Sequence, residues 1–148
     1  MKVVLQKVTE ASVGVNNDTI ASINHGYVLL VGVKEGDTIL EADYLARKVS
    51  KLRVFEDDEG KMNLDIHQVK GSILSISQFT LLADTKKGNR PSFTHSAEPS
   101  KALELYDYFN NQLRQEAIDV FEGEFGSHMA VSLVNDGPVT IVFDTDHK

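Results

Sequence analysis

The sequence predicts an α+β domain in which a mainly antiparallel or mixed β-sheet curls, or closes into a barrel, with two helices packed outside it. Two observations carry this prediction. Short apolar segments rich in β-branched residues recur along most of the 148 residues. Only two stretches have the three- or four-residue apolar spacing of an amphipathic helix. A chain of this length is most simply one domain, residues 1–148, and it can bury a core without disulfides.

The N-terminal part of the chain is predicted to consist of strands. Apolar residues alternate in part over residues 2–9, which predicts a first strand, and residues 20–23 and 27–33 predict two more. Asn16-Asn17-Asp18, between the first and the second of them, has the composition of a turn.

The first helix is predicted from its cap. Thr38 and Glu41 have the spacing of a capping box, and Asp37 is a competing cap. A strand at residues 53–56 and a turn at 57–60 follow the helix. The apolar face of the helix is formed by Ala42, Leu45, Ala46, Val49 and Leu52.

The rest of the chain is predicted to contain a second helix among strands. Residues 72–82 are apolar and β-branched enough to form a buried strand. The helix covers roughly residues 100–116, and strands follow at 119–124, 129–134 and 139–143. The apolar face of this helix is formed by Ala102, Tyr106, Phe109 and Leu113.

Composition excludes several functional classes. The chain has no cysteine, which excludes disulfides, a thiolate nucleophile and a cysteine-based zinc site. Its five histidines are scattered without metal-ligand spacing, so we expect no metal and no other cofactor. The longest apolar run, residues 27–33, is too short to cross a bilayer, and the N-terminus does not have the pattern of a signal peptide. We therefore expect a cytoplasmic protein with no membrane partner.

The charge balance narrows the class of partner. A formal net charge of −7 argues against a general nucleic-acid-binding protein, which would carry a basic balance. Cations nevertheless gather at Lys86, Lys87 and Arg90, in a loop that contains Gly88. These side chains suit contacts to phosphates, and a solvated polar loop without such a role is the competing interpretation.

Two short segments are the candidate functional motifs. Ser77-Gln78-Phe79-Thr80-Leu81 lies in the predicted strand 72–82, and no base stands near its hydroxyls in sequence, as a Ser or Thr nucleophile would need. Asn135-Asp136-Gly137-Pro138-Val139-Thr140 separates the last two predicted strands. Pro138 rules out a simple hairpin turn, because it removes a backbone donor, and it leaves nearby carbonyls without ladder partners. An ordinary loop between two strands is the competing interpretation.

Together, the two motifs resemble the D-aminoacyl-tRNA deacylase (D-Tyr-tRNA deacylase) family, the enzymes that edit chirality in translation. The resemblance covers essentially the whole chain and includes residues 3–13, Gly60-Lys61-Met62-Asn63-Leu64 and Arg90-Pro91-Ser92-Phe93. It implies hydrolysis of the ester bond of D-aminoacyl-tRNA, and of glycine mischarged on the tRNA for alanine, with release of free amino acid and tRNA. It also implies the curled-sheet fold and a homodimer.

The resemblance implies a catalytic mechanism that demands little of side chains. The catalytic positions are Ser77, Gln78, Phe79 and Thr80, and backbone N–H groups around the last two are expected to stabilise the oxyanion. The 2′-hydroxyl beside the reactive ester helps to activate water. We therefore expect no covalent intermediate and no metal.

Chiral selection is assigned by the resemblance to the Gly137–Pro138 peptide. In the family this peptide is cis and reaches into the active site of the partner subunit, where its carbonyl oxygens hold the α-amino group of the substrate. With the amine and the ester carbon both fixed, an L side chain clashes with the backbone, a D side chain points outward, and glycine passes.

The resemblance extends to contacts with the 3′ end of tRNA. It implies that Phe125 and Met129 line the pocket for the terminal adenosine, with packing in the core as an equal alternative. Lys86, Lys87 and Arg90 would then meet phosphates near that end.

One position departs from the family pattern. Lys7 stands where many relatives have arginine after Gln6. Lysine keeps the charge but lacks the bidentate fork, so any bracing of the Gly137–Pro138 segment by this residue is weaker or differently built.

Two alternatives stay open. A related editing enzyme with a trans Gly–Pro bond removes certain L-residues from mischarged tRNA. A nucleic-acid-binding module without hydrolysis belongs to a different class, and the acidic residues 144–148 do not favour it.

Overall fold

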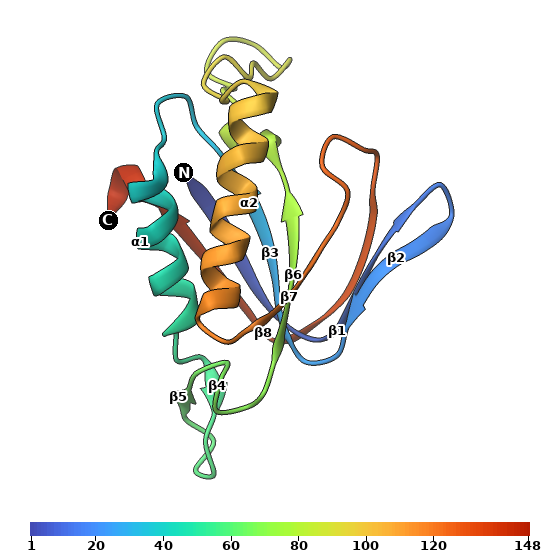
Figure 1. The fold of residues 1–148 in the computed structure, drawn as a ribbon, viewed down its shortest axis with the longest axis vertical. Coiled ribbons are helices and arrows are strands. Elements are labelled where there is room, and N and C mark those ends of the chain that lie inside the picture. The colour runs from blue at the N-terminus through green and yellow to red at the C-terminus, as the bar shows by residue number, and fades with distance from the viewer.

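A computed structural model describes all 148 residues and shows one strongly curled, mixed β-sheet. The strands of this sheet are β1 Lys2–Val15, β2 Asp18–Ile23, β3 Gly26–Gly32, β6 Ser72–Ser77, β7 Asp119–Glu122 and β8 Ala130–Asp144. Their order is β2-β1-β3-β6-β7, and β8 pairs with β1 (Figure 1). β1 is antiparallel to β2, β3 and β8, whereas β3, β6 and β7 are parallel. Because curling brings β2 close to β6 and β7, the sheet is nearly a closed barrel.

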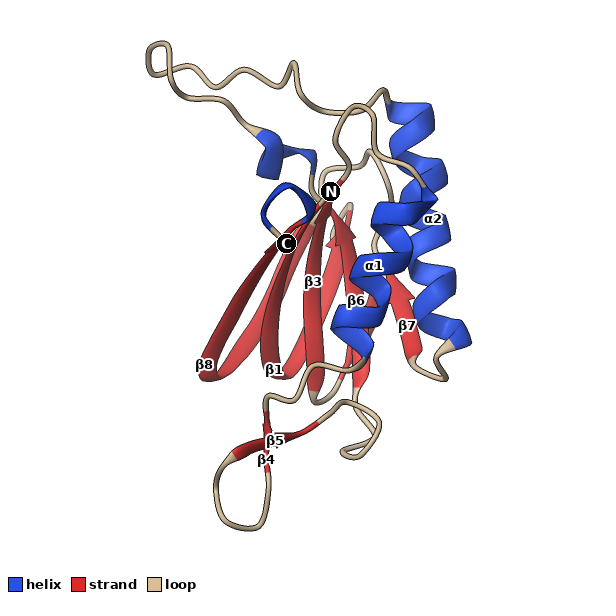
Figure 2. Cartoon of the chain, turned by 90° about the vertical axis from the view of Figure 1, so that its left-hand side faces the viewer, coloured by secondary structure: helices blue, strands red, loops and turns tan.

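Two helices, α1 (Ile39–Ser50) and α2 (Pro99–Gln115), cover one face of the sheet (Figure 2). The capping box predicted at Thr38 and Glu41 is present. The predicted fold class is thus confirmed, with both helices close to their expected bounds. No helix combines the length and the apolarity that a membrane crossing requires. The core between helices and sheet contains the fully buried Leu5, Leu29, Leu45, Leu105 and Phe109.

Two short strands form a separate hairpin, β4 (Phe55–Glu56) and β5 (Met62–Leu64), which projects from one end of the sheet (Figures 1 and 2). The strand predicted at residues 53–56 is therefore shorter than expected. Phe55 remains buried at the base of the hairpin, where its ring stacks on Tyr27 of β3 with the ring centroids 5.2 Å apart.

The strand predicted over residues 72–82 is wrong at its C-terminal end. β6 ends at Ser77, and Phe79–Leu82 form a short 3₁₀ helix, η1. The backbone N–H of Gln78 still donates to the carbonyl of Val31 at 2.7 Å, but the neighbouring strand β3 then ends at Gly32. A Cβ on Gly32 would lie 3.1 Å from the carbonyl oxygen of Gln78, so this glycine makes room for the turn.

The prediction of separate strands at residues 129–134 and 139–143 is also wrong. β8 pairs with β1 on both sides of residues 136–139, because Asn135 pairs with Val8 and Thr140 with Gln6. Four residues of β8 therefore stand opposite Lys7 alone and form a bulge in one continuous strand.

β1 likewise continues beyond its expected end at residue 9. Residues 2–8 of β1 pair with β3, and residues 11–15 pair with β2. The long strand therefore has two different partners, one after the other.

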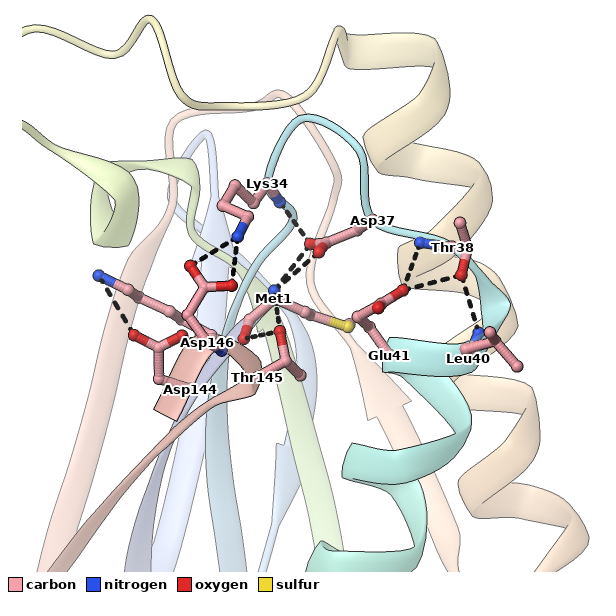
Figure 3. Close-up of polar contacts among 10 residues, drawn as sticks. Met1, Lys34, Asp37, Thr38, Leu40, Glu41, Asp144, Thr145 and Asp146 are labelled. Atoms are coloured by element: carbon pink, nitrogen blue, oxygen red, sulfur yellow. Dashed lines mark hydrogen bonds and ion pairs between the residues drawn. The ribbon is translucent and has the colours of Figure 1, made fainter. Parts of the chain in front are cut away.

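The α-ammonium group of Met1 is buried, and it links the two ends of the chain to the start of α1 (Figure 3). It donates to Asp37 Oδ1 at 2.9 Å and to Thr145 Oγ1 at 2.7 Å. Asp37 also accepts the backbone N–H of Lys34 at 2.7 Å. Asp37, the competing cap, therefore binds the N-terminus, while Thr38 caps the helix and accepts the N–H of Leu40 at 3.2 Å.

Candidate active site

The Ser77–Leu81 motif lies beside a cavity of about 450 Å³. The cavity is bounded by the C-terminal ends of β3 and β6 and by the first turns of α2. Ser77, Gln78 and Phe79 line it, so the structure brings three of the four predicted catalytic positions to one concave surface. These residues lie where β6 ends at Ser77 and the short helix η1 begins at Phe79, so the chain leaves the sheet at the cavity.

A second wall of the cavity comes from residues 125–129, between β7 and β8. Phe125 and Met129, the residues expected to line a pocket, both do so and are half-buried. Met129 packs directly over Gly123, where a Cβ would lie 2.6 Å from its sulfur. The glycine therefore sets how deeply the thioether lies in the wall.

Sequence reasoning missed the third wall. Tyr106 belongs to the apolar face of α2, and its helical spacing predicted a core position only. Its hydroxyl donates to the carbonyl of Ser75 at 2.7 Å, and burial raises its pKa to about 12. The phenol is therefore neutral at physiological pH and offers no base to the cavity. The other lining residues that were not expected are Val31, Val33, Ile76, Ser96, Ala97, Pro99, Ala102, Gly126, Ser127, His128 and Val131.

Backbone donors stand at the start of η1. The N–H of Leu81 donates to the carbonyl of Gln78 at 3.2 Å, which is the first bond of the turn. The N–H groups of Phe79 and Thr80 therefore have no partner within the turn. Such a pair of neighbouring N–H groups is suited to bind an oxyanion.

The fourth predicted catalytic side chain lies outside the cavity. Thr80 is exposed, and its Oγ1 accepts a hydrogen bond from Nε2 of Gln78. No histidine or carboxylate is hydrogen-bonded to this hydroxyl, which therefore lacks the base that a threonine nucleophile requires.

The Gly137–Pro138 segment does not line the cavity. Its peptide bond is cis, as the resemblance implies, and both residues are exposed. They lie in the bulge opposite Lys7, which pairs with Tyr27 at the start of β3. Ser77 instead pairs with Val31, near the other end of that strand.

Lys7 lies beneath this bulge. Its side chain is only 6% exposed, and its Nζ lies 3.6 Å from Oδ2 of Asp136 and 5.5 Å from the ring centre of Phe55. With lysine in place of arginine, one ion pair links this residue to the segment, and the cation–π contact with Phe55 holds its ammonium group.

The three predicted phosphate-binding cations are on a loop beyond η1, at the top of Figure 1. Lys86, Lys87 and Arg90 are exposed, form no ion pair and do not line the cavity. Asp84 and Ser92 close the foot of the loop with two backbone hydrogen bonds of 2.8 and 2.9 Å. The loop therefore presents three unpaired positive charges near the motif in a protein that is acidic overall.

Comparison with known proteins identifies the family. A family model described as D-Tyr-tRNA(Tyr) deacylase matches residues 4–144. The chain belongs to this deacylase family. A D-aminoacyl-tRNA deacylase of Bifidobacterium animalis subsp. lactis is 56% identical, over 99% of this chain and 98% of its own length. One from Bifidobacterium adolescentis is 54% identical over the same shares.

Solved structures agree with this deacylase fold. A protein described as c-Myc DNA Unwinding Element Binding Protein superposes with a TM-score of 0.91 at 39% identity, over 98% of this chain and 99% of its own. A probable eukaryotic D-amino acid tRNA deacylase gives 0.80 at 18% identity, over 96% and 97%, which shows the fold alone. The resemblance of the two motifs is thus confirmed. The deacylase is a hydrolase that acts on the ester bond of D-aminoacyl-tRNA.

Proposed function

We propose that the deacylase builds each active site from two copies of the chain, which form a homodimer. The observation that carries this proposal is the separation of the two motifs. Along β3, the partner of Lys7 precedes the partner of Ser77 by four residues, roughly 13 Å at about 3.3 Å per residue. The α-amino nitrogen and the ester carbon of a substrate are both bonded to the same Cα. One chain therefore cannot hold both groups with these motifs, whereas a second copy can supply Gly137–Pro138.

The cavity of one copy would bind the terminal adenosine and the ester. A volume of about 450 Å³ and a largely apolar lining suit a nucleoside, with Phe125 and Met129 against the base. Ser77 and Gln78 form the edge next to the ester, and the N–H groups of Phe79 and Thr80 donate to the developing oxyanion. Because no base is hydrogen-bonded to the Thr80 hydroxyl, the ribose 2′-hydroxyl is assigned the assistance of the attacking water. The reaction then needs neither a covalent intermediate nor a metal.

The second copy would select the enantiomer. Carbonyl oxygens of its Gly137–Pro138 segment accept hydrogen bonds from the α-ammonium group, which fixes the Cα between two anchors. A D side chain then points to solvent, and an L side chain meets backbone. Glycine has no side chain to reject, so glycine mischarged on the tRNA for alanine is a further substrate.

The cationic loop would contact the rest of the substrate. Lys86, Lys87 and Arg90 are free to neutralise phosphates near the 3′ end, which gives a tRNA partner to a chain of net charge −7. A tRNA substrate and the absence of cysteine also make the cytoplasm the proposed place of action.

The proposed chirality editing is tested by incubating the purified protein with D-Tyr-tRNA and L-Tyr-tRNA side by side in the presence of a chelator. We expect loss of the D-ester only, unaffected by the chelator, at a rate that falls as salt weakens the phosphate contacts. Loss of the L-ester would instead indicate the related L-editing enzyme. Loss of neither would indicate a binding module, and inhibition by the chelator would contradict the metal-free mechanism.

Thr80→Ala is expected to keep the larger part of the deacylation rate. The Thr80 hydroxyl lies outside the cavity, whereas the proposed donor is its backbone N–H, which alanine retains. The measurement is single-turnover hydrolysis of D-Tyr-tRNA, together with tRNA binding. An inactive variant that still folds and binds tRNA would make the hydroxyl a nucleophile or an essential donor.

A further inference from the structure

An aromatic pair stands at the mouth of the cavity, with Phe79 exposed and Phe93 half-buried. Phe79 lines the cavity, yet the residue remains 56% exposed. Its ring meets that of Phe93 edge to face, with ring centroids 5.0 Å apart and an interplanar angle of 69°. Phe93 does not line the cavity, so the pair extends from the cavity outward over the surface. A ligand that covers an apolar surface of this kind lowers the free energy by removing that surface from water.

Both rings are held in place by the backbone. Phe79 opens η1, and its carbonyl accepts the Ser96 hydroxyl at 3.5 Å. The carbonyl of Phe93 accepts the N–H of Ser96 at 3.1 Å, and the N–H of Ala97 donates to Val33, just beyond β3, at 3.0 Å. The foot of the cationic loop, closed at Ser92, directly precedes Phe93. The two rings are therefore in place before any ligand binds, which lowers the entropic cost of binding.

The surroundings of the pair indicate the class of ligand. On one side lies the apolar cavity, and on the other lies the loop with the unpaired Lys86, Lys87 and Arg90. Exposed aromatic rings next to free cations are the composition of surfaces that bind single-stranded nucleic acid, where rings stack on bases and cations meet phosphates. The cavity, the ring pair and the cations follow one another outward. A single strand that ends in the cavity would place its terminal nucleoside, its next base and its phosphates in the same order.

We propose that the Phe79–Phe93 pair is a stacking platform for the second base from the 3′ end of tRNA, the cytosine that precedes the terminal adenosine. This inference rests on the proposed function, in which the cavity holds that adenosine. The platform recognises a ring face and not a hydrogen-bonding edge, so it accepts every tRNA, as an enzyme that edits many aminoacyl-tRNAs requires.

The test uses full-length D-Tyr-tRNA, either intact or with an abasic ribose in place of the penultimate cytidine, which keeps every phosphate. For the wild-type protein we expect kcat/KM to fall about tenfold on removal of this base, the scale of one base–aromatic stack. Phe93→Leu is expected to lose a similar factor with intact tRNA and to show little further loss with the abasic tRNA. Phe93→Tyr, which keeps an aromatic ring, is expected to retain the preference for intact tRNA.

The outcomes separate the platform from the active site itself. Equal kcat/KM for intact and abasic tRNA in the wild-type protein would overturn the platform and leave the proposed function standing. A full abasic penalty that persists in a folded Phe93→Leu protein would also overturn it, because the base would then bind elsewhere. Failure of the wild-type protein to hydrolyse intact D-Tyr-tRNA would overturn the proposed function and, with it, the platform.

Discussion

Gly137→Ala is expected to reduce kcat/KM for D-Tyr-tRNA by about 100-fold or more, the scale of a 1 Å misplacement of a binding group. Gly137 has φ +128°, a conformation that side chains rarely adopt, and an added Cβ would lie 2.9 Å from Cγ2 and 3.1 Å from N of Val139. The segment must therefore shift, and its carbonyls leave the position at which they would hold the substrate amine. The measurement is single-turnover deacylation.

Gly60→Ala is the matched control for this substitution. Gly60 also has a positive φ, +76°, but an added Cβ would meet nothing within 4 Å, in the turn between β4 and β5. This variant also places a side chain at a positive φ but without the clash, so we expect near wild-type kcat/KM. Wild-type activity in Gly137→Ala would contradict the proposed role of the segment. Equal losses in both variants would indicate that an alanine at a positive φ, and not a shift of the segment, causes the loss.

Asp37→Ala is expected to lower the free energy of unfolding by about 3–5 kcal/mol, because it leaves a buried charge without its partner. The α-ammonium of Met1 is fully buried, and the side chain of Asp37 is 3% exposed at an N–O distance of 2.8 Å (Figure 3). The loss is measured by urea unfolding of the protein with its N-terminus free.

Asp146→Ala is the control for the ion pair at Asp37. Asp146 binds the ammonium of Lys34 close to the buried pair, and this contact lowers the pKa of Asp146, but its side chain is 50% exposed. Solvent screens such a pair, so its removal is expected to change the urea midpoint far less than Asp37→Ala does. Equal losses from the two variants would show that burial of the N-terminus contributes no additional stability.

Local pattern was sufficient to predict the helices and failed where partner strands decide the structure. The capping box at Thr38 and the apolar spacing of α2 depend on residues close in sequence, and both predictions are confirmed. The end of β6 at Ser77 depends instead on where β3 stops, which the apolar run 72–82 does not reveal. The bulge opposite Lys7 likewise depends on the register between β1 and β8.

The sequence motifs predicted part of the candidate site, but the wall that α2 contributes was not predicted. Five of the predicted residues line one cavity although they come from two segments more than forty residues apart in sequence: Ser77, Gln78, Phe79, Phe125 and Met129. The wall from α2 was missed because its face has the same helical spacing as an ordinary core face. The separation of Gly137–Pro138 from this cavity is a property of the register and has no signal in the sequence.

The two-copy active site is the central claim, and mixed dimers test it most directly. One chain carries Gly137→Ala, and the other carries Ala102→Trp, which fills the cavity at its α2 wall. Each variant alone is expected to keep about one per cent of the wild-type activity or less. If the segment acts across the interface, the mixed dimer has one site with both defects and one with neither, so it should regain about half of the wild-type activity. A purified mixed dimer as inactive as its parents would contradict the claim.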